Sequence, residues 1–248
     1  MTWREISSSR PVLYEAKGGW YYSTAKREGQ MNAGTESILT GLMNKAPELA
    51  PCRGAVVASF DLLLACFAGG GKVLTCGNGG SAADAEHIVG ELMKSFVLRR
   101  KPTAEQTARL KRAFPDSYQE LAEKFQQGLP AISLVSQTAL CSAIANDVAS
   151  DMVYAQQVFG YGRPGDLLIA ISTSGKSSNV VNAAKAAKAF GLHTIALTGP
   201  AQSPLGELAT AAIRAPGDST ALIQEFHLRI YHALCAMVEH ELFGGGEQ

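Results

Sequence analysis

The chain has 248 residues, enough for one large domain or two small ones. An apolar content of 46%, a charged content of 18% and a formal net charge of zero are typical of a globular protein, with no sign of a nucleic-acid or membrane surface. The N-terminus lacks the apolar core of a signal peptide, and no apolar run is expected to span a membrane. The five cysteines are widely spaced without a CxxC pair, so we expect a reduced, cytoplasmic protein.

The chain is predicted to divide into three regions. Residues 1–31 are predicted to be an irregular N-terminal extension, whose aromatic run at 20–22 is a candidate contact for a neighbouring subunit. Residues 32–248 are predicted to form one domain. Within it, residues 97–129 are polar and charged and are predicted to be an inserted helical hairpin, with helices near 103–113 and 117–126, that lies on the surface or covers an active site.

From residue 32 onward, helical patterns alternate with short apolar runs. Strands are predicted at 72–76, 129–135, 167–171, 193–197 and 211–215. Further helices are predicted at 32–50, where Pro51 ends the first, and at 53–68, 82–96, 138–145, 150–159, from 179, at 203–208 and at 219–242. This alternation predicts an α/β fold with a doubly wound parallel sheet that binds ligands at the carboxyl ends of its strands. The helix at 53–68 is apolar nearly all round, which favours burial from several sides and an oligomer.

The turn after the strand at 167–171 is rich in hydroxyl groups. Ser172, Thr173, Ser174 and Ser177 lie between the end of this strand and the start of the next helix. A helix N-terminus presents unpaired N–H groups and a partial positive charge, and the serines add hydroxyl donors, so the turn suits a phosphate. A serine N-cap on a tight turn is the plainer alternative.

Two segments partly match nucleotide-binding motifs. Gly175-Lys176-Ser177 matches the end of a P-loop, but the first glycine of that motif would fall at Ala170, inside the apolar run. The turn Gly77–Ser81 is glycine-rich and permits close approach of a ligand. It lacks the G-x-G-x-x-G spacing and the ribose-binding acid of a dinucleotide site, so neither motif supports nucleotide binding.

Polar side chains interrupt the apolar pattern of two predicted helices. His87 and Glu91 are four residues apart and share one face of the helix after the glycine-rich turn. The last helix carries Gln224, His227 and His232. A lone histidine in a helix is usually structural, but this number of polar groups beside phosphate-type turns makes a functional site an equally good interpretation.

With these residues in view, the sequence resembles a known family. The segments that carry the resemblance are GNGGSAADAEH with a following GE, IANDV, ISTSGKSSNV, ALTG and IQEFHLRIYH. Together they are similar to bacterial phosphoheptose isomerases, sugar-isomerase (SIS) domain proteins that convert D-sedoheptulose 7-phosphate to D-glycero-D-manno-heptose 7-phosphate. The resemblance covers about residues 32–96 and 129–243, and ISTSGxS by itself marks only the wider SIS superfamily.

The resemblance implies a five-stranded parallel sheet flanked by helices, and a homotetramer with active sites shared between subunits. It implies a phosphosugar isomerase with Glu91 as the base and His232 as its acid–base partner. It also implies a zinc (Zn2+) site, found in some members, made by His87, Glu91, Gln224 and His232. The sugar phosphate substrate would be bound by Asn78, Gly79, Gly80, Ser81, Asn146, Asp147, Ser172, Thr173, Ser174, Ser177 and Gln224.

The residue types suit this chemistry. Aldose–ketose isomerisation moves a proton between adjacent carbons through an enediol, which needs a carboxylate base and a donor to the carbonyl oxygen. A metal would polarise that carbonyl. Gln224 and His232 are eight residues apart, so they are separated by ~12 Å along a helix. One ion is therefore reached by both only if the Gln224 side chain extends toward it or if the two residues come from different subunits.

The sequence departs from the family pattern in four places. Lys176 replaces the usual Asn, and Ser95 beside Lys94 replaces an Arg after the glutamate. Ala221-Leu222 replaces an Asp-Arg pair, and the two extra segments described above are additions. Two alternatives therefore stay open: an isomerase of another ketose phosphate, and a non-catalytic SIS protein that binds a sugar phosphate or a partner protein.

Overall fold

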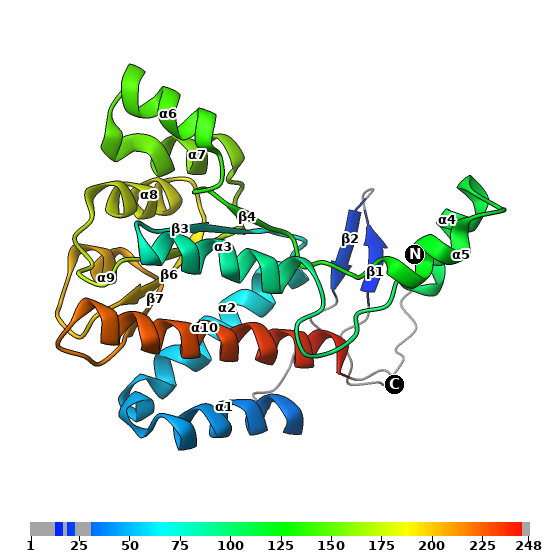
Figure 1. Cartoon of the computed structure of the whole chain (residues 1–248), viewed down its shortest axis with the longest axis horizontal. Helices are drawn as coiled ribbons and strands as arrows, with labels where there is room; N and C mark the ends of the chain where they lie inside the picture. Colours follow the sequence, from blue (N-terminus) through cyan, green and yellow to red (C-terminus); the bar gives the residue numbers. More distant parts are fainter. Residues whose placement is uncertain (1–12, 17–18, 23–30, 245–248) are drawn as a thin grey trace, which may run out of the picture.

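A computed structural model describes residues 13–16, 19–22 and 31–244, and Figure 1 shows how its elements are arranged. One sheet contains β3 (Val73–Cys76), β4 (Ala131–Ser133), β5 (Leu167–Ile171), β6 (His193–Thr198) and β7 (Ala211–Arg214). Its strand order is β4-β3-β5-β6-β7, and every neighbouring pair is parallel. The predicted five-stranded parallel sheet is therefore confirmed.

Helices lie on both faces of this sheet, and the helical hairpin at residues 104–124 projects away from it (Figure 1). They are α1 (Ala33–Lys45), α2 (Arg53–Ala68), α3 (Gly80–Met93), α4 (Ala104–Ala113), α5 (Tyr118–Lys124), α6 (Thr138–Asp147), α7 (Val153–Tyr161), α8 (Ser178–Ala189), α9 (Pro204–Leu208) and α10 (Thr220–Phe243), with 3-10 turns at Pro47–Cys52 and Ser150–Met152. The first core lies under α1, α2, α3 and α10, and the second lies under α6 to α9. The order of the predicted elements is correct.

The central strand β5 contributes to both cores. Leu167, Ile169 and Ile171 belong to the first, whereas Leu168 and Ala170 belong to the second. All five residues are buried because side chains alternate between the two faces of a strand and helices cover both faces. This explains why β5 reads in the sequence as a continuous apolar run.

The first predicted helix is too long. It was expected over 32–50 with Pro51 as its end, but α1 stops at Lys45 and a 3-10 turn begins at Pro47. Ala46, the residue before that proline, has φ −142° and ψ 75°, outside the helical region. The steric clash between a proline ring and the preceding residue disfavours helix there, so Pro47 ends α1.

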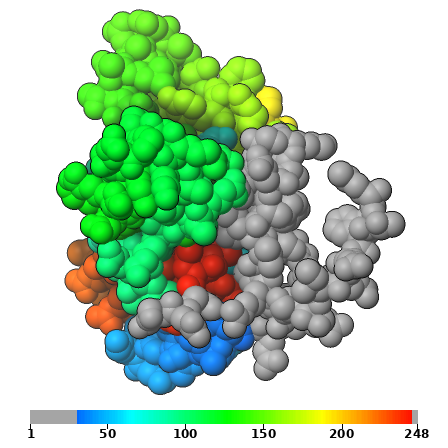
Figure 2. Space-filling model, turned by 90° about the vertical axis from the view of Figure 1, so that its right-hand side faces the viewer, coloured from blue at the N-terminus to red at the C-terminus, as the bar shows by residue number. Residues whose placement is uncertain are grey.

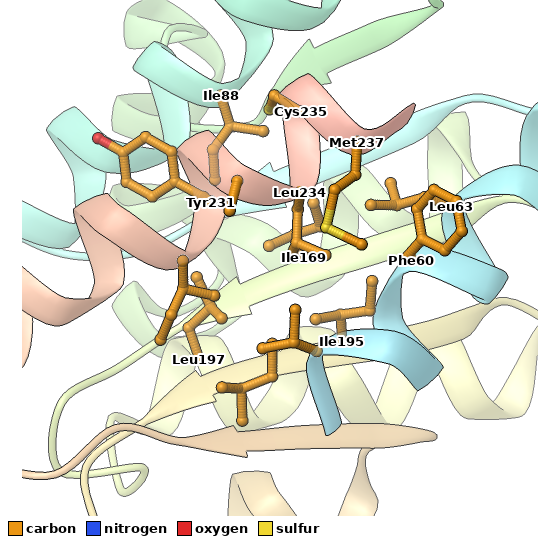
Figure 3. Close-up of a cluster of buried hydrophobic side chains, with 14 of the residues drawn as sticks. Phe60, Leu63, Ile88, Ile169, Ile195, Leu197, Tyr231, Leu234, Cys235 and Met237 are labelled. Carbon is orange, nitrogen blue, oxygen red and sulfur yellow. The ribbon is translucent and has the colours of Figure 1, made fainter. Parts of the chain in front are cut away.

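Pro47–Ala68 is long and apolar enough to cross a membrane by length and composition, with 22 residues and a hydropathy of 1.5, so the expectation that no run reaches that length is wrong. Its helical part α2 packs against α10, β7 and β5. Phe60 and Leu63 are buried there, and Figure 3 shows both in the apolar cluster with residues of β5, β6 and α10. In this structure 39% of its most apolar window is buried, and that buried face packs into the apolar core.

The structure differs from the prediction for the N-terminal extension and agrees with the helices predicted for the insertion. The N-terminal extension was expected to be irregular, but β1 (Leu13–Ala16) and β2 (Gly19–Tyr22) form an antiparallel hairpin. The other residues of 1–30 and the side chains of the aromatic run lie outside the described residues. The insertion forms α4 and α5 as predicted, and Figure 1 shows this hairpin projecting away from the sheet, so in this chain it does not cover the ends of the strands.

Candidate active site

The glycine-rich turn after β3 is shaped by its lack of side chains. Gly79 has φ +55°, a conformation that favours glycine. A Cβ on Gly77 would lie 2.4 Å from the Ser81 carbonyl oxygen, so the backbone of this turn closes tightly on itself. The turn leads directly into α3, which places Asp84, His87 and Glu91 along one helix.

The structure brings together three of the predicted polar residues. His87 Nε2 lies 3.1 Å from Glu91 Oε1 on α3, and 3.4 Å from His232 Nε2 on α10. Glu91 is only 9% exposed, whereas the His87 side chain is 43% exposed. A largely buried carboxylate thus lies beside two imidazoles that a small molecule can reach. We call His87, Glu91 and His232 the acid–base cluster.

Lys94 joins this cluster, a role that the sequence reasoning missed. Its Nζ lies 3.0 Å from Glu91 Oε2, so the two oxygens of Glu91 have different partners. The spacing i to i+3 on a helix is the signal that would have found this contact. Lys94 also donates to the Ser95 carbonyl oxygen, at the end of α3 where the family pattern has an arginine.

Gln224 does not reach the acid–base cluster. Its side chain lies at the start of α3, because a Cβ on Gly80 would be 2.5 Å from Gln224 Nε2. His87 is seven residues further along, a distance of roughly 10 Å on a helix. The four-residue ligand set implied by the resemblance is therefore not assembled by one chain, and His87, Glu91 and His232 remain as its core.

The two histidines of α10 are in different environments. Burial lowers the pKa of His232, the nearby His87 lowers it further, and Glu91 acts in the opposite direction. His232 is therefore uncharged near neutral pH. His227 is fully buried and its Nε2 contacts the Thr198 carbonyl oxygen at 3.1 Å, so this histidine has a structural role at the end of β6.

The hydroxyl-rich turn connects β5 to α8. Ser172 Oγ lies 3.1 Å from Ser177 Oγ and 3.5 Å from Ser174 Oγ, so three hydroxyls gather in one place. Ser177 is the N-cap residue but makes no side-chain cap hydrogen bond, which does not support the plain N-cap interpretation. Gly175 has φ +63°, which gives the turn its shape. The hydroxyls and the N-terminus of α8 together can bind an anion.

An amide pair holds the two turns together. Asn78 Nδ2 donates to Asn179 Oδ1, and Asn179 Nδ2 donates back to Asn78 Oδ1, both at 2.9 Å. Tyr154 Oη donates to the Gly77 carbonyl oxygen at 2.7 Å and lies 3.3 Å from Asn78 Oδ1. Asn179 and Tyr154 were not among the predicted site residues. Asn179 lies inside the ISTSGKSSNV segment, whereas nothing local distinguishes Tyr154.

The remaining residues predicted to bind the substrate lie outside the acid–base cluster. Asn146 and Asp147 are exposed at the end of α6, and Asn146 Nδ2 donates to Asp147 Oδ1 at 2.8 Å. Thr173 is half-buried, and its carbonyl oxygen accepts a hydrogen bond from Gly199 N–H. Ser81 is buried at the first turn of α3. In this chain the side chains of Asn146 and Asp147 therefore face solvent and not the acid–base cluster.

A zinc ion is compatible with the acid–base cluster only in part. Among the described residues, no three His, Cys, Asp or Glu side chains are arranged so that they could hold a metal ion. The donor types are nevertheless suitable, and donors of a tetrahedral zinc site lie about 3.3 Å apart. The His87–Glu91 and His87–His232 contacts of 3.1 and 3.4 Å are close to that spacing. These three residues fit zinc by type and by two of their contacts.

The chain is similar in sequence to known proteins. Residues 53–199 match the SIS domain family model. The phosphoheptose isomerase of Shewanella baltica (strain OS155 / ATCC BAA-1091) is 37% identical over 217 residues, which cover 86% of this chain and 95% of that protein. The phosphoheptose isomerase of Shewanella sediminis is 38% identical over 197 residues, covering 78% and 87%.

Two solved structures have a similar fold. A phosphoheptose isomerase from Francisella tularensis superposes with a TM-score of 0.64 and 30% identity, covering 83% of this chain and 94% of that one. The phosphoheptose isomerase from Neisseria gonorrhoeae superposes with a TM-score of 0.61 and 32% identity, covering 84% and 94%.

Proposed function

Because this chain belongs to the phosphoheptose isomerase family of SIS-domain proteins, we propose that it converts D-sedoheptulose 7-phosphate to D-glycero-D-manno-heptose 7-phosphate. The observation that carries the proposal is the contact between α3 and α10. His87 and His232 are 145 residues apart in the chain, yet their Nε2 atoms meet beside the Glu91 carboxylate. Such an arrangement offers a base and a proton carrier to one substrate.

In this reaction Glu91 takes the proton from the carbon next to the carbonyl and returns it to the neighbouring carbon. His232 is uncharged near neutral pH, so it exchanges a proton between the two substrate oxygens as the enediol forms. Lys94 bonds one oxygen of Glu91 and leaves the other to face His87, which fixes the orientation of the base.

The phosphate end of the sugar would lie in the hydroxyl-rich turn. Ser172, Ser174 and Ser177 offer hydroxyl donors, and the first turn of α8 offers backbone N–H groups. The amide pair of Asn78 and Asn179 keeps this turn at a fixed position relative to the glycine-rich turn at the start of α3. The phosphate group would therefore lie at the carboxyl ends of β3 and β5.

The zinc site would be made by His87, Glu91 and His232, without Gln224 of the same chain. A zinc ion bound there would polarise the substrate carbonyl and stabilise negative charge on its oxygen. Lys94 competes with the ion for Glu91, because its ammonium already neutralises one carboxylate oxygen.

The family resemblance also leads us to propose a homotetramer in the cytoplasm. Apolar side chains remain exposed on several helices, including Leu140 and Phe159, which are 39% and 57% exposed. On α2, Val57 and Leu62 are only partly buried. Burial of such groups between subunits would stabilise an assembly. The five cysteines are all free thiols, which agrees with a reducing compartment.

The substitution Glu91→Gln tests the function. It preserves the shape of the side chain and removes the base, so turnover of sedoheptulose 7-phosphate should fall by ~10²–10⁴ with binding largely retained. The assay measures product formation and solvent-deuterium incorporation, with the metal content of each sample determined in parallel. The matched control is Glu86→Gln on the same helix, which removes only a contact with Ser136 and should retain parental turnover.

The outcome that contradicts the proposal is equally definite. A folded, zinc-loaded parent protein that incorporates no solvent deuterium into any ketose phosphate would exclude the isomerase. Tight binding of the sugar phosphate without exchange would then identify a non-catalytic binding protein.

A further inference from the structure

Tyr231 is the neighbour of His232 on α10 and contacts the acid–base cluster from the protein interior. Its side chain is 2% exposed, and Figure 3 shows its ring beside the apolar cluster with its hydroxyl pointing outward from that cluster. The hydroxyl lies 2.9 Å from His87 Nδ1 and 3.2 Å from Asp84 Oδ1. One hydroxyl therefore serves two side chains of α3.

The directions of these two hydrogen bonds are constrained by chemistry. An ionised carboxylate only accepts, so the single hydroxyl proton of Tyr231 is donated to Asp84. Toward His87 the hydroxyl oxygen then has only lone pairs to offer, so Nδ1 must carry a proton and donate it. A neutral imidazole has one N–H, which leaves His87 Nε2 unprotonated.

The unprotonated Nε2 faces the two other members of the cluster. It lies 3.1 Å from Glu91 Oε1 and 3.4 Å from His232 Nε2. The Glu91 carboxylate repels this lone pair. The Lys94 ammonium on the other oxygen of Glu91 offsets part of the repulsion, and a cation between Nε2 and Oε1 would remove the rest. In the opposite tautomer, Nε2–H would donate to Glu91 and would be closed to a metal ion.

We propose that Asp84 and Tyr231 form a positioning pair that fixes the Nδ1–H tautomer of His87 and so keeps its Nε2 open as a cation ligand beside Glu91. The tautomer does not depend on the proposed function, whereas its use in binding zinc rests on it. Tyr231 and Asp84 act through His87, so they are positioning residues and not catalytic ones.

Burial raises the pKa of Asp84, whereas the hydrogen bond from Tyr231 and the nearby His87 act in the opposite direction, so donation by Tyr231 favours the ionised, accepting carboxylate. Asp84 lies one turn before His87 on α3, and its Oδ2 is buried without a hydrogen-bond partner among the described residues. The rings of His87 and Tyr231 are packed edge to face at 5.5 Å, which restricts rotation of the imidazole. The hydroxyl and the ring of Tyr231 thus both hold His87 in one orientation.

The first test reads the tautomer directly in the metal-free full-length protein. With ¹⁵N-labelled histidine in mildly alkaline buffer, long-range ¹H–¹⁵N correlation spectra distinguish a protonated from an unprotonated ring nitrogen, and His87→Asn identifies the His87 signals. We expect Nδ1–H in the parent. In Tyr231→Phe and Asp84→Ala we expect Nε2–H to become the major form, because Glu91 is then the best acceptor left.

The second test measures zinc itself, by competition with a chromophoric chelator. Loss of a group that orients a metal-binding histidine typically lowers affinity 10- to 100-fold, so Tyr231→Phe should bind zinc that much more weakly. Tyr118→Phe, which removes a hydroxyl from the surface helix α5, is the control and should bind zinc like the parent.

Either measurement can overturn the proposal. A parent protein with Nε2–H on His87 refutes the tautomer, and a Tyr231→Phe variant with parental tautomer and parental zinc affinity refutes the role of the pair. A parent that binds no zinc but has the Nδ1–H form would refute the metal site of the proposed function while leaving the positioning pair established. Unchanged circular dichroism of each variant confirms that its fold is intact.

Discussion

Glu239 lies two turns after His232 on α10 and accepts hydrogen bonds from the segment that follows α3. Its Oε1 accepts from Phe96 N–H and from Arg100 Nε, and its Oε2 accepts from Val97 N–H and Leu98 N–H. Figure 2 shows the red end of α10 beneath the green segment that begins here. The substitution Glu239→Gln would remove the negative charge and replace one acceptor by an amide NH2 group.

The expected loss of stability follows from burial. The side chains of Glu239 and Arg100 are both 0% exposed, and Arg100 also donates to the carbonyl oxygens of Leu92 and Glu91 at the end of α3. Removal of one partner of a buried ion pair leaves the other charge uncompensated and costs about 3–5 kcal/mol. For a domain of this size, that lowers the melting temperature by roughly 6–20 °C.

The assay is thermal unfolding followed by circular dichroism at fixed protein concentration. The control is Glu120→Gln, which breaks an exposed pair with Lys124 on α5 and should change stability by about 0.5 kcal/mol or less. If Glu239→Gln melts within the error of that control, the buried pair does not anchor the segment and this reasoning is wrong.

The same site predicts a pH dependence. Burial by itself raises the pKa of Glu239, but the backbone donors of Phe96, Leu98 and Val97, together with Arg100, outweigh it and leave the pKa below its usual value. A carboxyl with a lowered folded-state pKa contributes stability above its unfolded pKa and loses it as the pH falls through the folded one. The difference in melting temperature between parent and Glu239→Gln should therefore shrink in acid.

Two further predictions concern ligand and assembly. Lys176 is exposed beside the hydroxyl-rich turn, so Lys176→Asn should raise the KM for a sugar phosphate by roughly two- to five-fold at moderate salt and leave kcat unchanged. An unchanged KM would mean that its ammonium points away from the phosphate. Sedimentation at micromolar concentration should detect a tetramer, and a purely monomeric protein would argue against active sites shared between subunits.

The local sequence determined most of the fold. The bounds of β5 and α2 were predicted from their apolar runs and from the glycine and proline residues that flank them. A strand buried on both faces leaves an uninterrupted apolar stretch in the sequence. Thr103, Ser203 and Ser219 are N-cap residues, and their hydroxyl groups accept hydrogen bonds from backbone N–H groups in the first turn of each helix. These features depend on neighbours within a few residues, which the sequence displays directly.

The tertiary structure determined which residues far apart in the sequence contact one another. The spacing of His87 and Glu91 predicted a shared helix face, but only the packing of α10 against α3 brought His232 to that face and placed Gln224 at its far end. The roles of Tyr231 and Arg100 could not be predicted either, because a tyrosine in an apolar helix and an arginine in a basic run are not distinguished by their neighbours in the sequence. Their partners are more than 130 residues away in the chain, and such contacts are fixed by how helices pack on the sheet.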